Sequence, residues 1–462
     1  MQAQFDLVLN QILTNLPPPQ TQQPRIAVAY SGGLDSAVLL KLCATFAQHH
    51  SLPLMALHVH HGLSPNADAW VAHCEQQCKA MDIPFEVAYV QLGQTQDEGI
   101  EATARKKRYS ALGQLSQQHQ IDVLLTAHHQ DDQAETLLLQ LLRGAGIAGL
   151  CGMQQSHYAK SLLENETLLL VRPLLNATRE EIERYATEHQ IQHIEDESNL
   201  DERFARNALR HQIMPLLAQH FPGFQSRFAR TALHAQSALV LLEQLAQQDY
   251  RLCLSESNSR ELNVVTLQDL PDERIDNVLR YWIAAHNVQM PSAARLSEIR
   301  KQLLHARHDA QVCVKHGEVE VHRYRQQLSI AKCALPTPDA ISFVWQGQAS
   351  IAFPSFAGQL CFHQAQPDQF GIPSKWLAEQ RLQIRPRQGG ERLKLAPNRP
   401  TRDMKSHYQT AGIAYWQRER LPFVFADKEL VFAAGIGMNG ALSALQLNGD
   451  QADCYVLEWQ AD

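Results

Sequence analysis

The feature that most constrains this chain is an apolar segment that runs directly into a turn with two adjacent glycines. Residues 26–30 (Ile-Ala-Val-Ala-Tyr) predict a strand, residues 31–36 follow as a turn, and a helical pattern begins after them. Adjacent glycines let the backbone turn tightly and bring its N–H groups close to an anion, and the helix N-terminus adds further donors. A phosphate-binding loop is therefore predicted, the alternative being a serine-rich helix cap. Its residues are Ser31, Gly32, Gly33, Leu34, Asp35 and Ser36.

Strand-like and helix-like patterns alternate between residues 25 and 189. This alternation predicts an α/β fold, a doubly wound parallel sheet with helices on both faces. In such a sheet, ligands bind beyond the carboxyl ends of the strands, and the loop at residues 31–36 lies at one such end. The expected strands are 26–30, 54–59, 85–90, 121–127 and 168–171. The expected helices are 36–48, 66–81, 98–118, 130–143 and 178–189.

The pattern changes after about residue 215. Helical segments dominate next, at 225–250, 272–287 and 292–306, and the tail has short apolar segments broken by Gly and Pro. These patterns predict a helical middle domain followed by a small α+β C-terminal domain. The expected divisions are an N-terminal helix and linker (1–24), an α/β domain (25–215), the middle domain (216–342) and the C-terminal domain (343–462).

Charge and cysteine content narrow the class of protein. The 462 residues allow two or three domains, and the net charge of −7 excludes a uniformly basic nucleic-acid binder. Between residues 381 and 428, however, eleven Lys and Arg stand against four acids, which predicts a local polyanion site. The nine cysteines include no C-x-x-C pair, so free thiols in a reducing compartment are expected. Without a signal-like or long apolar segment, a cytoplasmic protein with no membrane contact is expected.

A second polar segment follows the predicted strand at 121–127. It begins with His128 and His129 and carries Asp132 and Glu135, which are three residues apart and therefore share one helix face. Paired carboxylates near a helix N-terminus can hold a cation, either Mg²⁺ or an ammonium group. Two alternatives stay open. One is a transition-metal site formed by His128, Asp132 and Glu135, and the other is a solvated acidic helix start.

Several motifs together resemble one family. Residues 31–36 resemble the SGGxDS loop of the ATP pyrophosphatases, and they lack the Gly-Lys-Ser/Thr of a Walker-type loop. Other segments are similar to motifs of the tRNA(Ile)-lysidine synthetases, least clearly between about 225 and 380. These segments are 57–63, 127–136, 142–146, 172–175, 194–210, 390–393, 404–405 and 411–422.

This resemblance implies a PP-loop ATP pyrophosphatase domain, a substrate-binding middle domain and a tRNA-binding C-terminal domain. It implies a ligase that uses ATP and Mg²⁺ to adenylate the C2 oxygen of the wobble cytidine in isoleucine tRNA with a CAU anticodon, releasing pyrophosphate. Free L-lysine then displaces AMP and leaves lysidine. The oligomeric state stays open, with a homodimer among the alternatives.

The resemblance also implies roles for residues near the predicted loop. Residues 31–36 would hold the pyrophosphate, Asp35 would contact magnesium, and His60 would lie near the adenine or ribose of ATP. Asp132 and Glu135 would bind the lysine ammonium and help to remove its proton. The implied catalytic residues are Asp35, Arg105, Arg108, Asp132, Glu135 and Arg206.

Alternatives remain for the arginines. Arg105 and Arg108 would neutralise the transferring adenylyl group, or would be ordinary surface residues of a helix. Arg206 and Arg210 would contact substrate phosphate, or would pair locally with Asp201 or Glu202. The implied tRNA-binding residues are Arg210, Arg385, Arg387, Arg392, Lys405, Arg418 and Arg420, with Tyr408, Tyr415 and Trp416 available to stack on bases.

Three rival functions are compatible with parts of this pattern. A tRNA thiolase of the same group would also adenylate a base, but many such enzymes use C-x-x-C pairs, which are absent here. An amidating synthetase would need ammonia and would not require a basic tail. A non-catalytic, nucleotide-regulated RNA-binding protein would bind tRNA without releasing pyrophosphate, and would leave the paired carboxylates without a role.

Overall fold

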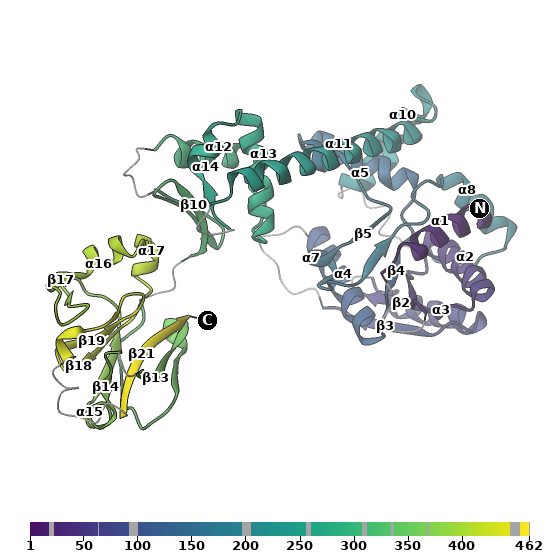
Figure 1. Ribbon diagram of the computed structural model, residues 1–462. Helices are drawn as coiled ribbons and strands as arrows, with labels where there is room; N and C mark the ends of the chain where they lie inside the picture. The colour runs from purple at the N-terminus through teal and green to yellow at the C-terminus, as the bar shows by residue number, and fades with distance from the viewer. Residues whose placement is uncertain are drawn as a thin grey trace. The chain divides into compact units, whose positions relative to one another are not determined.

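The computed structural model describes residues 1–17, 23–62, 64–91, 100–195, 205–255, 260–306, 312–333, 337–366, 369–443 and 453–461. The chain forms two compact units, Met1–Leu245 and Ala246–Asp462, and the boundary falls within the long helix α11 (Phe224–Cys253). Figure 1 shows the elements of each unit. In the described part of the chain, no helix is both long enough and apolar enough to cross a membrane.

The first unit is built on a six-stranded sheet with the strand order β3-β2-β1-β4-β6-β5. All neighbouring pairs are parallel except β5 with β6, so the predicted parallel sheet is confirmed and carries one antiparallel edge strand. All five predicted strands are present. The bounds are β1 (Ile26–Ala29), β2 (Leu54–His60), β3 (Phe85–Tyr89), β4 (Val123–Leu125), β5 (Ser156–Tyr158) and β6 (Leu169–Val171).

Helices cover both faces of this sheet because successive strand residues point to opposite sides. Ile26 and Val28 pack into the core formed with α1, α2, α3 and α8, whereas Ala27 packs into the core formed with α4 and α7. The helix bounds are α1 (Gln2–Thr14), α2 (Leu34–His50), α3 (Ala67–Ala80), α4 (Ile100–Gln118), α5 (Gln130–Leu142), α6 (Ile147–Leu150), α7 (Lys160–Leu163) and α8 (Arg179–Glu188).

A short helical segment connects the sheet to α11. It consists of α9 (Ala205–Ala208), the π-helix η2 (Leu209–Ile213) and α10 (Met214–His220). Met214 of this segment and Phe224 of α11 pack against Ala134 of α5, which places the segment beside the start of α5. Single turns of π-helix occur frequently at functional sites.

The second unit begins with the predicted helices and an antiparallel sheet that the sequence analysis did not anticipate. The sheet has the order β7-β10-β9-β8, and its alternate residues Val314, Val321 and Leu328 pack against the helices. The elements are β7 (Leu262–Asn263), α12 (Val264–Gln268), α13 (Asp272–Ala285), α14 (Ala293–Leu304), β8 (Val312–His316), β9 (Val319–Tyr324) and β10 (Gln327–Lys332).

The C-terminal part contains two larger antiparallel sheets that share one core, and helices at their edges, as predicted for an α+β domain. One sheet has the order β11-β15-β18-β19-β20 and the other β12-β13-β21-β14. The strands are β11 (Ile341–Phe343), β12 (Ser350–Phe353), β13 (Gly358–Gln364), β14 (Ile372–Pro373), β15 (Leu382–Arg385), β16 (Arg392–Leu393), β17 (Arg402–Asp403), β18 (Phe423–Ala426), β19 (Glu429–Ala433), β20 (Gly437–Met438) and β21 (Cys454–Ala461). The helices are α15 (Ser374–Glu379), α16 (Met404–Thr410) and α17 (Tyr415–Arg418).

Candidate active site

The predicted phosphate-binding loop joins β1 to the N-terminus of α2. Ser36 Oγ donates to the carbonyl of Gly33 at 2.9 Å and accepts from the backbone N–H of Ser31 at 3.2 Å, so the loop is closed by one hydroxyl. Ser31 Oγ lies 3.1 Å from Ser36 Oγ. Gly33 is the N-cap of α2 in extended conformation and no side chain caps it. The first N–H groups of this helix are therefore available to an anion.

Gly32 has a φ of +86°, which a residue with a side chain rarely adopts. Its carbonyl accepts from the N–H of Ile194 at 2.9 Å, which holds Ile194 against the loop. A Cβ added at Gly32 would lie 2.7 Å from Ile194 Cδ1 and 2.8 Å from Cys74 Sγ. The glycine is thus required by both the turn and its close packing.

Asp35, the predicted magnesium partner, is paired with an arginine that the sequence analysis did not place in the site. Arg179 Nη1 donates to Asp35 Oδ1 at 2.6 Å. Arg179 is the first residue of α8, which begins with a capping box between Thr178 and Glu181. Asp35 Oδ2 also lies 3.8 Å from His129 Nε2. Burial alone would lower the pKa of His129, but Asp131, Asp132 and Asp35 together hold it above its ordinary value.

Asp132 and Glu135, on the first turns of α5, are buried and lie side by side as predicted. Two guanidinium groups bind them. Arg206 donates to Glu135 Oε2 at 2.7 Å and to Asp132 Oδ1 at 2.9 Å. Arg210 donates to Glu135 Oε1 at 2.7 Å and to Asp132 Oδ1 at 3.0 Å. Burial by itself would raise the pKa of Asp132, but His129 and Arg206 keep it well below its ordinary value, so the carboxylate is ionised.

This arrangement gives the two arginines partners that the sequence did not predict. In this structure neither Arg206 nor Arg210 presents its guanidinium to solvent as an unpaired phosphate contact, because both are engaged with the carboxylate pair. Asp201 and Glu202, the predicted local partners, lie outside the described residues. The arginines stand on α9 and η2, four residues apart, and therefore approach the pair from one helix face.

His128 does not join the carboxylates in a metal site. Its Nδ1 lies 3.0 Å from Thr126 Oγ1, and burial lowers its pKa to about 3, so the ring is neutral at pH 7. Within the described ranges, His128, Asp132 and Glu135 do not bring three ligand atoms together. The carboxylate oxygens are instead satisfied by arginine, which disfavours the transition-metal alternative. A solvated acidic helix start is also excluded, because Glu135 is 1% exposed.

One cavity of about 1090 Å³ connects the loop to Glu135 of the carboxylate pair. Its lining includes Ser31, Asp35, Arg179, Glu135 and Arg210. Such a volume is large enough for a nucleotide and part of a second substrate.

His60, Arg105 and Arg108 also line this cavity, as the sequence analysis expected of residues near the nucleotide. His60 ends β2, with Nε2 3.2 Å from Asp68 Oδ1. The exposed Arg105 lies over the ring of Tyr109 at 5.0 Å. Arg108 Nε donates to His61 Nε2 at 3.0 Å. Two positive groups therefore border the cavity, which suits contact with a polyphosphate.

Comparison with known proteins assigns all three regions. A family model described as the PP-loop domain matches residues 1–217. The TilS substrate binding domain matches residues 262–329, and the TilS substrate C-terminal domain matches residues 382–459. A tRNA(Ile)-lysidine synthase from Burkholderia pseudomallei (strain K96243) is 39% identical over 445 residues, covering 90% of this chain and 89% of its own. The chain belongs to the tRNA(Ile)-lysidine synthase family. The resemblance inferred from the sequence is confirmed.

Other members of the family match to a similar extent. The tRNA(Ile)-lysidine synthase from Ralstonia nicotianae (strain ATCC BAA-1114 / GMI1000) is 40% identical and covers 91% of each chain. Among solved structures, a U34-tRNA thiolase from Methanococcus maripaludis covers 50% of this chain and 76% of its own, with 16% identity and a TM-score of 0.42. A TILS C-terminal domain covers 27% of this chain and 98% of its own, with 21% identity and a TM-score of 0.21.

In the second unit, part of the predicted tRNA-binding set is buried. Arg418 is 7% exposed, and its guanidinium donates to the carbonyl of Ile413 at 2.8 Å and to Tyr324 Oη at 3.1 Å. Tyr408 is fully buried, and Trp416 is 8% exposed. Arg418 therefore holds the fold together instead of facing a ligand, and neither ring offers a free face to a base. The sequence could not distinguish these residues from surface ones, because Arg, Tyr and Trp occur in both settings.

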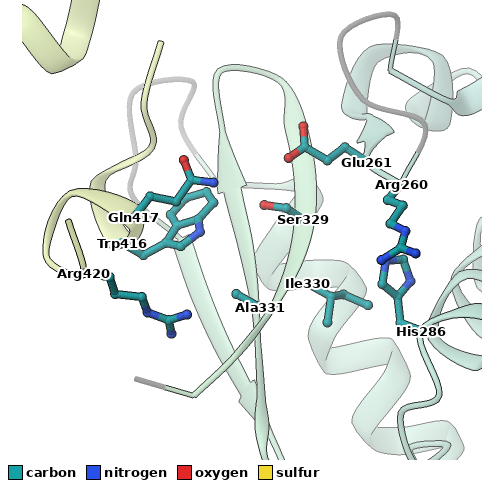
Figure 2. A pocket seen from close by; sticks show the side chains of 9 residues that line it. All are labelled: Arg260, Glu261, His286, Ser329, Ile330, Ala331, Trp416, Gln417 and Arg420. Atoms are coloured by element: carbon teal, nitrogen blue, oxygen red, sulfur yellow. The ribbon is translucent and has the colours of Figure 1, made fainter. Parts of the chain in front are cut away.

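The remaining basic residues lie at or near the surface. Arg392, Lys405 and Arg420 are exposed, and Arg385 and Arg387 are half-buried. Arg385 lies over the ring of Phe425 at 3.9 Å. Arg420 lines a cavity of about 250 Å³, which also has Arg260 and His286 in its lining (Figure 2). These five residues are therefore accessible, fully or in part, to a polyanion.

Proposed function

We propose that this chain ligates free L-lysine to C2 of the wobble cytidine of isoleucine tRNA with a CAU anticodon, converting ATP to AMP and pyrophosphate. The observation that carries the proposal is the cavity that joins the PP-loop to Glu135, the buried carboxylate that lies beside Asp132. A phosphate site and an ammonium site in one cavity are what an adenylation followed by attack of an amine requires.

In the first step, the backbone donors and hydroxyls of residues 31–36 hold the β- and γ-phosphates while the cytidine oxygen attacks the α-phosphorus. Arg105 and Arg108 reduce the negative charge that develops on the transferring group. Magnesium fits this site through Asp35, because Mg²⁺ is commonly held by one or two carboxylates together with substrate phosphates. When bound there, the ion would neutralise the leaving pyrophosphate. Arg179, which now pairs with Asp35, would give way or move to a phosphate oxygen.

In the second step, Asp132 and Glu135 bind the lysine side chain and orient its nitrogen toward the adenylated C2. The nitrogen must lose a proton before it attacks, and a carboxylate of the pair is the acceptor within reach. Since Arg206 and Arg210 occupy both carboxylates in this structure, lysine binding requires at least one arginine to move. An arginine that leaves the pair can then contact phosphate, the role expected of it from the sequence.

The test is a pyrophosphate-release assay with ATP and magnesium, comparing CAU-anticodon isoleucine tRNA with methionine tRNA, each with and without lysine. The RNA is then digested and the masses of its nucleosides are measured by mass spectrometry. A lysine adduct of cytidine, formed only on the isoleucine tRNA, is the expected result. Pyrophosphate release without the adduct would support the adenylation step but contradict lysine as the second substrate. It would favour the thiolase alternative. The absence of release would favour the non-catalytic RNA-binding protein.

Point variants of the tail separate a basic tRNA-binding surface from internal packing. Lys405→Ala removes an exposed charge and is expected to weaken tRNA binding without changing thermal stability. The slope of the logarithm of the tRNA binding constant against the logarithm of the salt concentration should decrease in magnitude by about 1. Arg418→Ala removes a buried guanidinium and is expected to cost about 1–3 kcal/mol of stability, because the carbonyl of Ile413 loses its partner. Binding titrations at several salt concentrations measure the effect on tRNA binding, and urea unfolding measures the effect on stability. An Arg418→Ala chain of unchanged stability would contradict its assigned packing role.

The compartment, the oligomeric state and the domain limits belong to the same proposal. The cytoplasm supplies tRNA, ATP and free lysine together, and we place the reaction there. A homodimer would be detected by sedimentation of the purified chain. The proposed limits of the domains, 25–215, 216–342 and 343–462, are tested by limited proteolysis and mass spectrometry of the stable fragments.

A further inference from the structure

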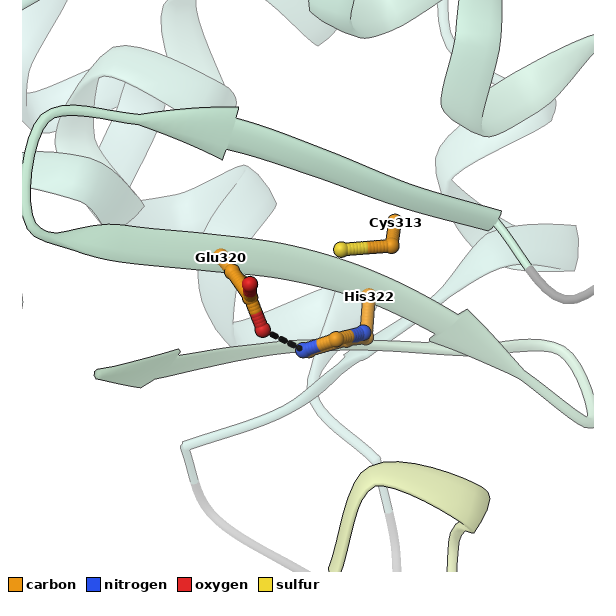
Figure 3. A group of neighbouring side chains, drawn as sticks. All are labelled: Cys313, Glu320 and His322. Atoms are coloured by element: carbon orange, nitrogen blue, oxygen red, sulfur yellow. Dashed lines mark ion pairs between the residues drawn. The ribbon is translucent and has the colours of Figure 1, made fainter. Parts of the chain in front are cut away.

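Three side chains that could bind a metal ion meet on one face of the small sheet in the second unit. In the antiparallel register, Cys313 of β8 lies opposite His322 of β9, and Glu320 precedes His322 by two residues. Residues opposite one another, or two apart on one strand, point to the same face. Sγ of Cys313, a carboxylate oxygen of Glu320 and a ring nitrogen of His322 all lie within 4.8 Å of one another (Figure 3).

The imidazole of His322 is the deepest of the three groups. Its side chain is 1% exposed, and its Nε2 makes no hydrogen bond with any residue that the structure describes. Glu320 Oε2 lies 3.3 Å from Nε2. Two ligands of a tetrahedral zinc ion with bonds of about 2.0–2.2 Å are separated by roughly this distance. The ring nitrogen and the carboxylate oxygen are therefore spaced as neighbouring ligands of one ion would be.

The groups around the three side chains are those that a metal site uses to orient its ligands. The other ring nitrogen of His322, Nδ1, lies 3.2 Å from Tyr415 Oη, so a hydrogen bond there would leave Nε2 as the lone-pair donor. The second oxygen of Glu320, Oε1, lies 3.4 Å from Lys315 Nζ. The ring of His322 stacks on Trp416 with centroids 4.0 Å apart and an interplanar angle of 8°. The imidazole and the carboxylate are thus both oriented by contacts that leave Nε2 of His322 and Oε2 of Glu320 facing each other.

We propose that Cys313, Glu320 and His322 bind one Zn²⁺ ion, leaving a fourth position for water. A thiolate, an imidazole and a carboxylate together form a donor set that suits zinc, whereas Mg²⁺ and Ca²⁺ prefer oxygen alone. Cys313 is exposed, which gives the ion a path from solvent. The ion would tie β8 to β9 and, through His322, fix Tyr415 and Trp416 of α17. This site is independent of the ligase reaction.

Cobalt(II) is the probe that tests this site, because a thiolate bound to Co²⁺ gives a charge-transfer band in the near ultraviolet. The full-length chain, treated with chelator and reductant, is titrated with Co²⁺ and then with Zn²⁺ in the absence of ATP and tRNA. We expect one equivalent of Co²⁺ to develop the band and Zn²⁺ to displace it. Cys313→Ser should abolish the band, and Tyr415→Phe should weaken binding about tenfold, as the loss of an orienting hydrogen bond does.

The matched control is Cys333→Ser, which removes another partly accessible thiol of the same sheet region and should leave the band unchanged. Because Cys313 is exposed, Cys313→Ser is expected to fold, and its thermal unfolding is compared with that of the parent chain. Three results would overturn the proposal: no saturable binding, a band that survives Cys313→Ser, or a band lost equally in Cys333→Ser. The first would mean that Glu320 only pairs with Lys315 and His322.

Discussion

Glu135→Gln is expected to reduce lysidine formation at least about 100-fold while pyrophosphate release on isoleucine tRNA continues. Glu135 is 1% exposed and faces the cavity from α5, so a neutral amide of the same shape removes charge without leaving a void. An amide attracts an ammonium weakly and cannot accept its proton, and loss of a positioned base typically costs a factor of about 100–10,000. Single-turnover assays that follow pyrophosphate and lysidine separately measure the two steps.

The control for this variant is Glu180→Gln, which neutralises an exposed carboxylate in the first turn of α8. Both proteins are also compared by thermal unfolding, because Glu135→Gln leaves Arg206 and Arg210 with one buried carboxylate between them. A folded Glu135→Gln protein that forms lysidine at the parent rate would place the lysine site elsewhere. Equal loss of both steps would assign the carboxylate pair to adenylation.

Gly32→Val should weaken ATP binding by about 10- to 100-fold. A β-branched residue at a φ of +86° is strongly disfavoured, and its Cβ would lie 2.7 Å from Ile194 Cδ1. Such strain costs about 1–3 kcal/mol per residue, and moving the loop to relieve it would take hydrogen-bond donors away from the phosphates. Each 1.4 kcal/mol corresponds to a tenfold change in affinity. Equilibrium binding of ATP to the variant and the parent chain measures the effect.

Gly317→Val is the matched control, since Gly317 has a φ of +58° in the turn between β8 and β9 and a Cβ there meets nothing within 4 Å. This variant carries a comparable backbone penalty in the other unit, so it should lose stability but retain ATP affinity. If Gly32→Val binds ATP as tightly as Gly317→Val does, the loop is not the phosphate site.

The parts of the site that follow from local pattern could be predicted from the sequence. The strand, turn and helix around residues 26–50, and the shared face of Asp132 and Glu135, depend on spacing within one segment. The partners of these groups could not be predicted in the same way. Arg179 reaches Asp35 across 144 residues of sequence, and Arg206 reaches Glu135 across 71, so each pairing depends on the path of the chain.

The same distinction explains the errors in the second unit. The basic count between residues 381 and 428 indicated a charged surface, but it could not show that Arg418 points inward to Ile413 and Tyr324. The sheet of the middle region was missed because the helices α13 and α14 that precede β8, β9 and β10 dominate the sequence pattern. Val319–Tyr324 alternates valine with polar residues, which is a strand signal, yet those polar residues are themselves buried.

Because Arg206 and Arg210 contact the carboxylate pair, a charged ligand that binds there must keep the charges of this part of the site balanced. Two positive groups balance two negative ones in this structure. An ammonium ligand brings a single positive charge, so it can replace one arginine but not both without leaving a buried negative charge uncompensated. We therefore expect one ammonium group to replace one guanidinium at the carboxylate pair. The second arginine stays in place and balances the remaining negative charge.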